Sequence, residues 1–87
     1  MTEKWQEFKV KNSPGHKPEK QIKIKAPNHE EAIALFIKTI QTDINDIMIE
    51  DKENIFRYDD LRTSFKDIDK LINNPENIKA KIIKEQN

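Results

Sequence analysis

The sequence predicts a small α+β domain in which two β-hairpins flank one helix. Two pairs of short segments within residues 4–58 alternate apolar and polar side chains, as half-buried strands do. Between the two pairs, residues 29–41 repeat apolar side chains at three- and four-residue spacing, which is typical of a helix. The 87 residues suffice for one domain, 1–87, with a modest core.

The first hairpin is predicted from two alternating segments, 4–11 and 21–26. Residues 12–18 lie between them and contain the only glycine and two of the four prolines, which is a loop composition. The two strands are therefore expected to pair antiparallel across a long loop.

The helix over residues 29–41 has a clear start. Pro27 ends the preceding strand, and Asn28 can accept a hydrogen bond from the first turn. Glu31 stands three positions later, where a capping box places a carboxylate that reaches back. The positions that define the predicted buried face are Ile33, Phe36, Ile37 and Ile40.

A second hairpin follows, with strands over 46–51 and 55–58 joined by a polar turn. A helical stripe then runs from residue 59 or 60 to 72. Asn74 and Pro75 can open a last helix over residues 75–87, which we expect to dock loosely because its apolar edge is thin. That edge, which could equally form a homodimer contact, consists of Ile78, Ile82 and Ile83.

Residues 4–58 thus follow the order strand, strand, helix, strand, strand. This order resembles a β-grasp-like architecture, a four-stranded sheet crossed by one helix, here followed by one or two C-terminal helices. No sequence motif identifies a family, and architecture alone does not give function.

Side-chain parity assigns the strand residues to two faces of the sheet. The face toward the helix is predicted to carry Phe8, Val10, Ile22, Ile24, Ile47, Ile49, Phe56 and Tyr58. The opposite face would carry Trp5, Glu7, Lys9, Lys11, Lys23, Lys25, Met48, Glu50, Ile55 and Arg57. This basic face has three interpretations: a solvated outer surface, a surface for nucleic acid or an acidic partner, or an interior covered by the C-terminal helices.

Charge is segregated along the chain although the net charge is zero. Residues 1–29 carry seven lysines and three glutamates, whereas residues 30–69 carry eleven acidic and five basic residues. Segregated charge favours a module that selects partners by electrostatic complementarity. An acidic surface that meets a basic protein groove, or merely solubilises the chain, is predicted from Glu50, Asp51, Glu53, Asp59, Asp60 and Asp67.

The sequence lacks the patterns of most catalytic and ligand sites. It contains no cysteine, and a single glycine cannot form a glycine-rich phosphate loop. A paired acid–base role would need His16 and His29 within reach of one substrate, and nothing in their spacing requires that. An enzymatic function would therefore need one of them beside a carboxylate in a cleft. We therefore expect no catalytic residue, no metal and no cofactor.

The expected function is a non-enzymatic protein–protein interaction module. Fourteen isoleucines, fourteen lysines and eight asparagines suggest AT-rich coding DNA, as in low-GC bacteria or their phages and plasmids. Small size, missing catalytic motifs and segregated charge then favour an accessory or inhibitory factor of a phage or mobile element. Without an apolar leader or a membrane-length apolar run, the expected location is the cytoplasm, with no membrane contact. The alternative is a nucleic-acid-binding protein that uses Lys9, Lys11, Lys23, Lys25, Arg57 and Trp5.

Overall fold

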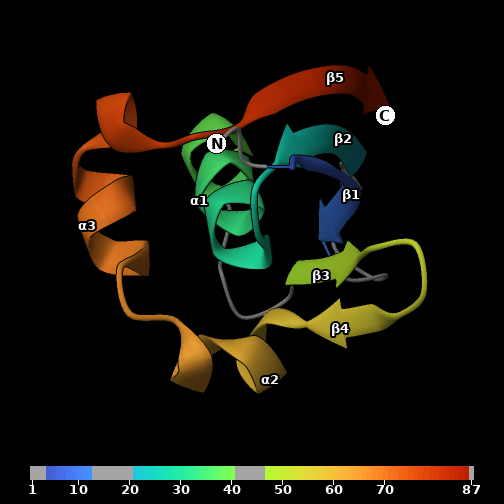
Figure 1. Ribbon diagram of the computed structural model, residues 1–87, viewed down its shortest axis with the longest axis horizontal. Helices are drawn as coiled ribbons and strands as arrows, with labels where there is room; N and C mark the ends of the chain where they lie inside the picture. The colour runs from blue at the N-terminus through green and yellow to red at the C-terminus, as the bar shows by residue number, and fades with distance from the viewer. Residues whose placement is uncertain (1–3, 13–20, 41–46, 87) are drawn as a thin grey trace.

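The computed structural model describes residues 4–12, 21–40 and 47–86. The strands are β1 (Gln6–Asn12), β2 (Gln21–Ala26), β3 (Ile47–Glu50), β4 (Ile55–Arg57) and β5 (Lys81–Gln86). The helices are α1 (His29–Ile40), α2 (Tyr58–Leu61) and α3 (Ile68–Asn73), with short 3-10 turns η2 (Arg62–Ser64) and η3 (Pro75–Asn77). Figure 1 shows α1 between the sheet and α3, so the molecule has three layers.

The sheet has five strands in the order β4-β3-β1-β2-β5, and every neighbouring pair is antiparallel. The predicted α+β class and both predicted hairpins are confirmed. The predicted count of four strands is wrong because β5 adds a fifth, and the β-grasp-like arrangement is not confirmed. The predicted loop over residues 12–18 lies, apart from Asn12, outside the described residues.

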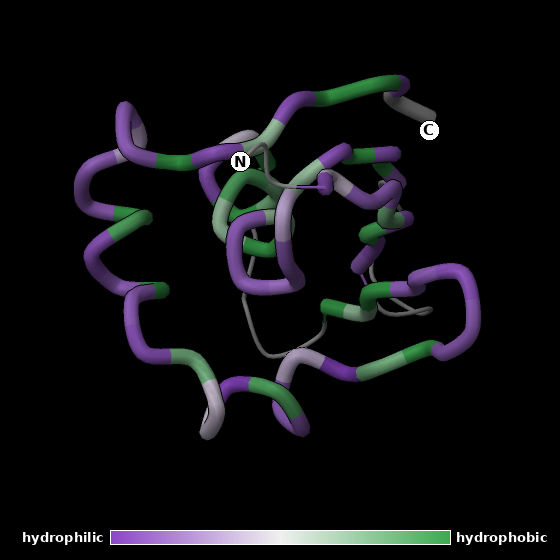
Figure 2. The backbone as a smooth tube through the Cα atoms, viewed as in Figure 1, coloured by the Kyte–Doolittle hydropathy of each residue, from purple (hydrophilic) through white to green (hydrophobic). Residues whose placement is uncertain are grey.

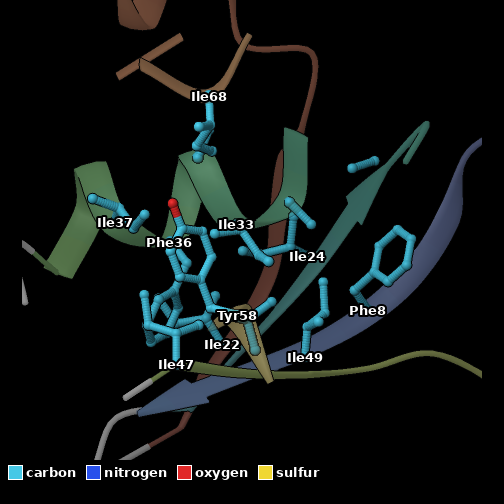
Figure 3. Close-up of a cluster of buried hydrophobic side chains, with 14 of the residues drawn as sticks. Phe8, Ile22, Ile24, Ile33, Phe36, Ile37, Ile47, Ile49, Tyr58 and Ile68 are labelled. Atoms are coloured by element: carbon cyan, nitrogen blue, oxygen red, sulfur yellow. The ribbon is translucent and has the colours of Figure 1, made fainter. Parts of the chain in front are cut away.

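The predicted parity of the strands is confirmed. The side chains predicted to face α1 from β1, β2 and β3 are each at most 2% exposed, and Figure 3 shows several of them gathered against α1. Phe56 is half-buried, and Tyr58 is buried but belongs to α2 rather than to β4. Figure 2 shows the alternation of hydrophobic and hydrophilic residues along β1 and β2.

Helix α1 is buried on two sides. Its start is as predicted, because Asn28 Oδ1 accepts a hydrogen bond of 2.9 Å from the Glu31 backbone N–H. The Glu31 carboxylate does not close the predicted capping box and instead accepts the Lys79 backbone N–H at 3.0 Å. The helix packs against the sheet on one side and against Ile68 and Leu71 of α3 on the other.

The predicted helix over residues 59–72 is divided into two short helices. The Ser64 hydroxyl donates a hydrogen bond of 2.7 Å to the Leu61 carbonyl, a local bond that competes with helix continuation. Phe65 then takes an extended conformation (φ −82°, ψ 133°), which ends η2. Helix α3 begins at Ile68. The residue before it, Asp67, donates its backbone N–H to the Glu30 carboxylate at 2.7 Å.

The predicted final helix over residues 75–87 is wrong. Only Pro75–Asn77 form a 3-10 turn, and the chain then continues into β5. Cross-strand pairing explains the difference: Ile82 lies opposite Ile24, and β-branched side chains pack well on a pleated surface. Without β5, the edge of β2 would remain unpaired among the described strands.

Candidate functional site

The outer face of the sheet points away from α1 and is basic. Directly opposed residues of neighbouring strands share a face, so Lys84 and Lys81 of β5 join Lys23 and Lys25 of β2 there. We call this surface the lysine face. Its charged residues are Glu7, Lys9, Lys11, Lys23, Lys25, Glu50, Arg57, Lys81 and Lys84.

The C-terminal helices do not cover the lysine face. Helix α3 packs on α1, and Figure 1 places it on the side of α1 remote from the sheet. The third interpretation of this face, an interior position, is therefore wrong. Lys25 and Arg57 are exposed, while Lys9, Lys11 and Lys23 are half-buried.

Three lysines stand next to one another in the central row of the lysine face. The row crosses all five strands and reads Lys84, Lys23, Lys9, Glu50, Ile55. Opposed Cβ atoms lie about 4.5–5.5 Å apart, and like-charged side chains at directly opposed positions destabilise a sheet. None of these lysines forms an ion pair within the described part of the chain. The row can therefore accept an anion.

A depression of about 280 Å³ lies on the lysine face beside the β3–β4 turn. Pairing of β1 with β3 ends at Lys9, so Glu7 and Phe8 have no β3 residue opposite them. Charges of both signs surround the depression, and its lining residues are Glu7, Phe8, Lys9, Lys23, Glu50, Asp51 and Lys52. Such a lining suits a polar side chain with both donors and acceptors better than a small apolar ligand.

The sequence prediction missed the two lysines that β5 contributes. Residues 79–82 read Lys, Ala, Lys, Ile, and this alternation of polar and apolar residues has the two-residue period of a strand. It is the pattern in the sequence that could have predicted β5. The adjacent Ile82 and Ile83 break that period, and a register shift of β5 against β2 occurs at this point. Trp5, also predicted for this face, precedes β1 and is half-buried.

The predicted acidic residues are distributed over four elements. Glu50 stands on the lysine face next to Lys9, and Asp51 is engaged by His29. Glu53 is exposed in the β3–β4 turn. The remaining three are exposed and lie beyond the other end of β4, on α2 and before α3: Asp59, Asp60 and Asp67. Asp59 also pairs with Arg62 at 3.9 Å.

His29 and Asp51 join the first turn of α1 to the β3–β4 turn. His29 Nε2 lies 3.1 Å from Asp51 Oδ2. Asp51 Oδ1 accepts the backbone N–H groups of Glu53 and Asn54, both at 2.8 Å. These two backbone bonds, and then the His29 contact, hold the pKa of Asp51 below its usual value of 3.8.

The contacts of the His29 ring give it a structural role. The ring centroid lies 4.8 Å from that of Phe8 and 5.4 Å from that of Phe56. The enzymatic alternative required a histidine beside a carboxylate in a cleft. His29 lies beside Asp51, but it is not among the residues that line the depression on the lysine face, and His16 lies outside the described residues. Within the described residues, no group of three or more histidine and acidic side chains is arranged to hold a metal.

Comparisons with protein-family models, curated proteins and solved structures returned no match to this chain. In the described part of the chain, no helix has both the length and the apolar character needed to cross a bilayer.

Replacing Asp51 by Asn should lower stability at neutral pH by about 1 kcal/mol, because a charged acceptor of several hydrogen bonds is lost. Because the pKa of Asp51 is lower in the folded protein, the unfolded chain binds more protons in acid than the folded protein does. The free energy of unfolding of wild type should therefore fall as the pH drops below about 4. Asp51→Asn should lose less stability over that range. Urea unfolding at pH 7 and pH 3 measures both effects, with Asp60→Asn as an exposed control at pH 7. An identical pH dependence for wild type and Asp51→Asn would contradict this assignment.

Replacing Lys23 by Glu should raise stability, because the carboxylate would stand between Lys9 and Lys84. We expect a gain of about 0.5–1 kcal/mol at low salt, and a smaller gain at 1 M salt. Lys25→Glu is the matched control, since Lys25 already lies between Glu7 and Lys81 and reversal gives no net gain. Urea unfolding at two salt concentrations measures the difference. Equal changes in the two variants would rule out the repulsive row.

Proposed function

We propose that the protein is a protein–protein interaction module without enzymatic activity, and that the lysine face is its contact surface. The observation that supports this most is the open row of Lys84, Lys23 and Lys9. Mutual repulsion makes the row unfavourable in the free protein, and an anionic partner would relieve that repulsion. The cytoplasm is the proposed compartment, which the absence of cysteine fits.

A protein partner is favoured over nucleic acid by the mixture of groups on the face. Glu7 and Glu50 stand among the lysines and would repel phosphates. Met48 and Ile55 flank Arg57 at the β4 end, and Ile55 is 58% exposed. Apolar groups beside charged ones are typical of a protein interface. The chain also has a near-neutral pI of about 6.7, whereas nucleic-acid-binding domains are typically much more basic.

Nucleic-acid binding is the second candidate, and the lysines of β5 support it. Lys81 and Lys84 extend the lysines of the predicted set, Lys9, Lys11, Lys23 and Lys25, into one surface across three strands. Such a surface could follow a phosphate backbone without reading sequence. An accessory or inhibitory role in a phage or mobile element stays a prediction from the sequence alone.

An affinity experiment with three baits tests the surface and the class of partner. Wild type, Lys9→Glu/Lys23→Glu and Asp59→Lys/Asp60→Lys would be incubated with nuclease-treated bacterial lysate at low salt. We expect proteins retained by wild type to be retained at least tenfold less by the first variant and equally by the second. Retention that depends on Asp59 and Asp60 would assign the function to the acidic residues instead.

A gel shift with single- and double-stranded oligonucleotides at two salt concentrations distinguishes nucleic-acid binding, the second candidate function, from protein binding. A shift at low salt that Lys9→Glu/Lys23→Glu abolishes would favour nucleic acid. Absence of any shift at low salt, where phosphate contacts are strongest, would remove that candidate.

A further inference from the structure

Strand β5 provides an open edge of the sheet. It ends the strand order on one side, and no described strand pairs with its outer edge. An edge strand presents unpaired N–H and C=O groups that can pair with another chain. The opposite edge strand, β4, has three residues and leads directly into α2, whereas β5 has six residues. The usable edge is therefore that of β5.

Apolar side chains are exposed on this edge strand. Among the described residues, three large apolar side chains are exposed, and two of them are Ile82 (40%) and Ile83 (47%) of β5. Ile82 lies opposite the fully buried Ile24 and so points to the α1 side of the sheet. Figure 2 shows this hydrophobic stretch of β5 at the rim of the molecule.

The two sides of β5 differ in chemistry. Lys81 and Lys84 point to the lysine face, opposite Lys25 and Lys23, whereas Ile82 points to the other side. A strand placed next to β5 would continue both surfaces. Its side chains on one side would meet lysines, and those on the other would meet an apolar group.

We propose that β5 accepts an extended segment of a partner protein as a sixth strand. The segment alternates acidic residues, which face Lys81 and Lys84, with apolar residues on the side of Ile82. About six residues, roughly 20 Å of strand, match the length of β5. The inference rests on the proposed function and specifies how the partner contacts the protein: backbone hydrogen bonds give affinity, and the alternating side chains give specificity.

Charge selects this partner over a second copy of the chain. Two copies joined antiparallel through β5 would place both lysine faces on the same side of one continuous sheet. The lysines Lys81 and Lys84 of each copy would then lie close to those of the other, and like charges at that distance repel. The same lysines attract an acidic strand, so they disfavour self-association and favour the partner.

The probe is a fluorescein-labelled hexapeptide of alternating glutamate and valine, titrated with the full-length protein and followed by fluorescence anisotropy. Two control peptides accompany it: one in which lysine replaces glutamate, and one with the original side chains but every amide N-methylated. The protein variants are Lys81→Glu/Lys84→Glu on the edge strand β5 and Lys9→Glu/Lys23→Glu on the inner strands β1 and β2. Circular dichroism and urea unfolding verify that each variant is folded.

We expect the glutamate peptide to bind wild type and to lose at least tenfold in affinity for Lys81→Glu/Lys84→Glu, which should prefer the lysine peptide. The N-methylated peptide should also lose at least tenfold, because it cannot donate backbone hydrogen bonds. Equal binding of the N-methylated and parent peptides would overturn strand addition.

The variants separate this proposal from the proposed function. If the N-methylated peptide binds as well as the parent, but Lys9→Glu/Lys23→Glu weakens both, strand addition fails and the lysine face remains the contact surface. If no lysine variant changes the affinity, both proposals fail. A concentration-dependent dimer in sedimentation experiments that the peptide cannot dissociate would assign the β5 edge to a second copy and overturn the proposal.

Discussion

The first turn of α1 is the point on which the arrangement of the described segments depends. Three consecutive side chains there hold three segments that are distant in sequence. His29 contacts Asp51 of the β3–β4 turn, and Glu30 accepts the Asp67 N–H before α3. Glu31 accepts the Lys79 N–H just before β5. Carboxylates at a helix N-terminus also complement the helix dipole, so the same groups stabilise α1 and fix the chain around it.

These contacts determine which face of the sheet stays open. Because Glu30 holds the start of α3 beside α1, the buried side chains of α3 add to the core on the helical side. The Lys79 backbone N–H donates to the Glu31 carboxylate, which places the start of β5 next to α1 and beside the edge of β2. Strand β5 pairs with that edge and adds Lys81 and Lys84 to the lysine face. The helical core and the basic surface thus lie on opposite sides of one sheet.

Local patterns in the sequence predict the parts that depend on near neighbours. The alternation in β1 and β2 predicts which side chains lie on each face of the sheet, and Asn28 predicts where α1 begins. The partners of Glu30 and Glu31 lie 37 and 48 residues away, and no local pattern specifies them. Strand β5 was missed because its register shift interrupts the alternation around Ile83, so two lysines of the candidate site were missed with it. Asp51 was predicted to belong to an acidic surface. In the structure its carboxylate instead accepts a backbone hydrogen bond within the β3–β4 turn and contacts His29.

Amide hydrogen exchange at Asp67 and Lys79, measured by NMR in wild type and in Glu30→Ala/Glu31→Ala, tests this account most directly. Both residues are exposed, yet their N–H groups donate to the two carboxylates at 2.7 and 3.0 Å. We expect at least tenfold protection of both amides in wild type and its loss in the variant, while the paired amides of β1 and β2 stay protected. Exchange of the wild-type amides at the rate of an open chain, or protection that survives in the variant, would contradict the role assigned to the first turn of α1.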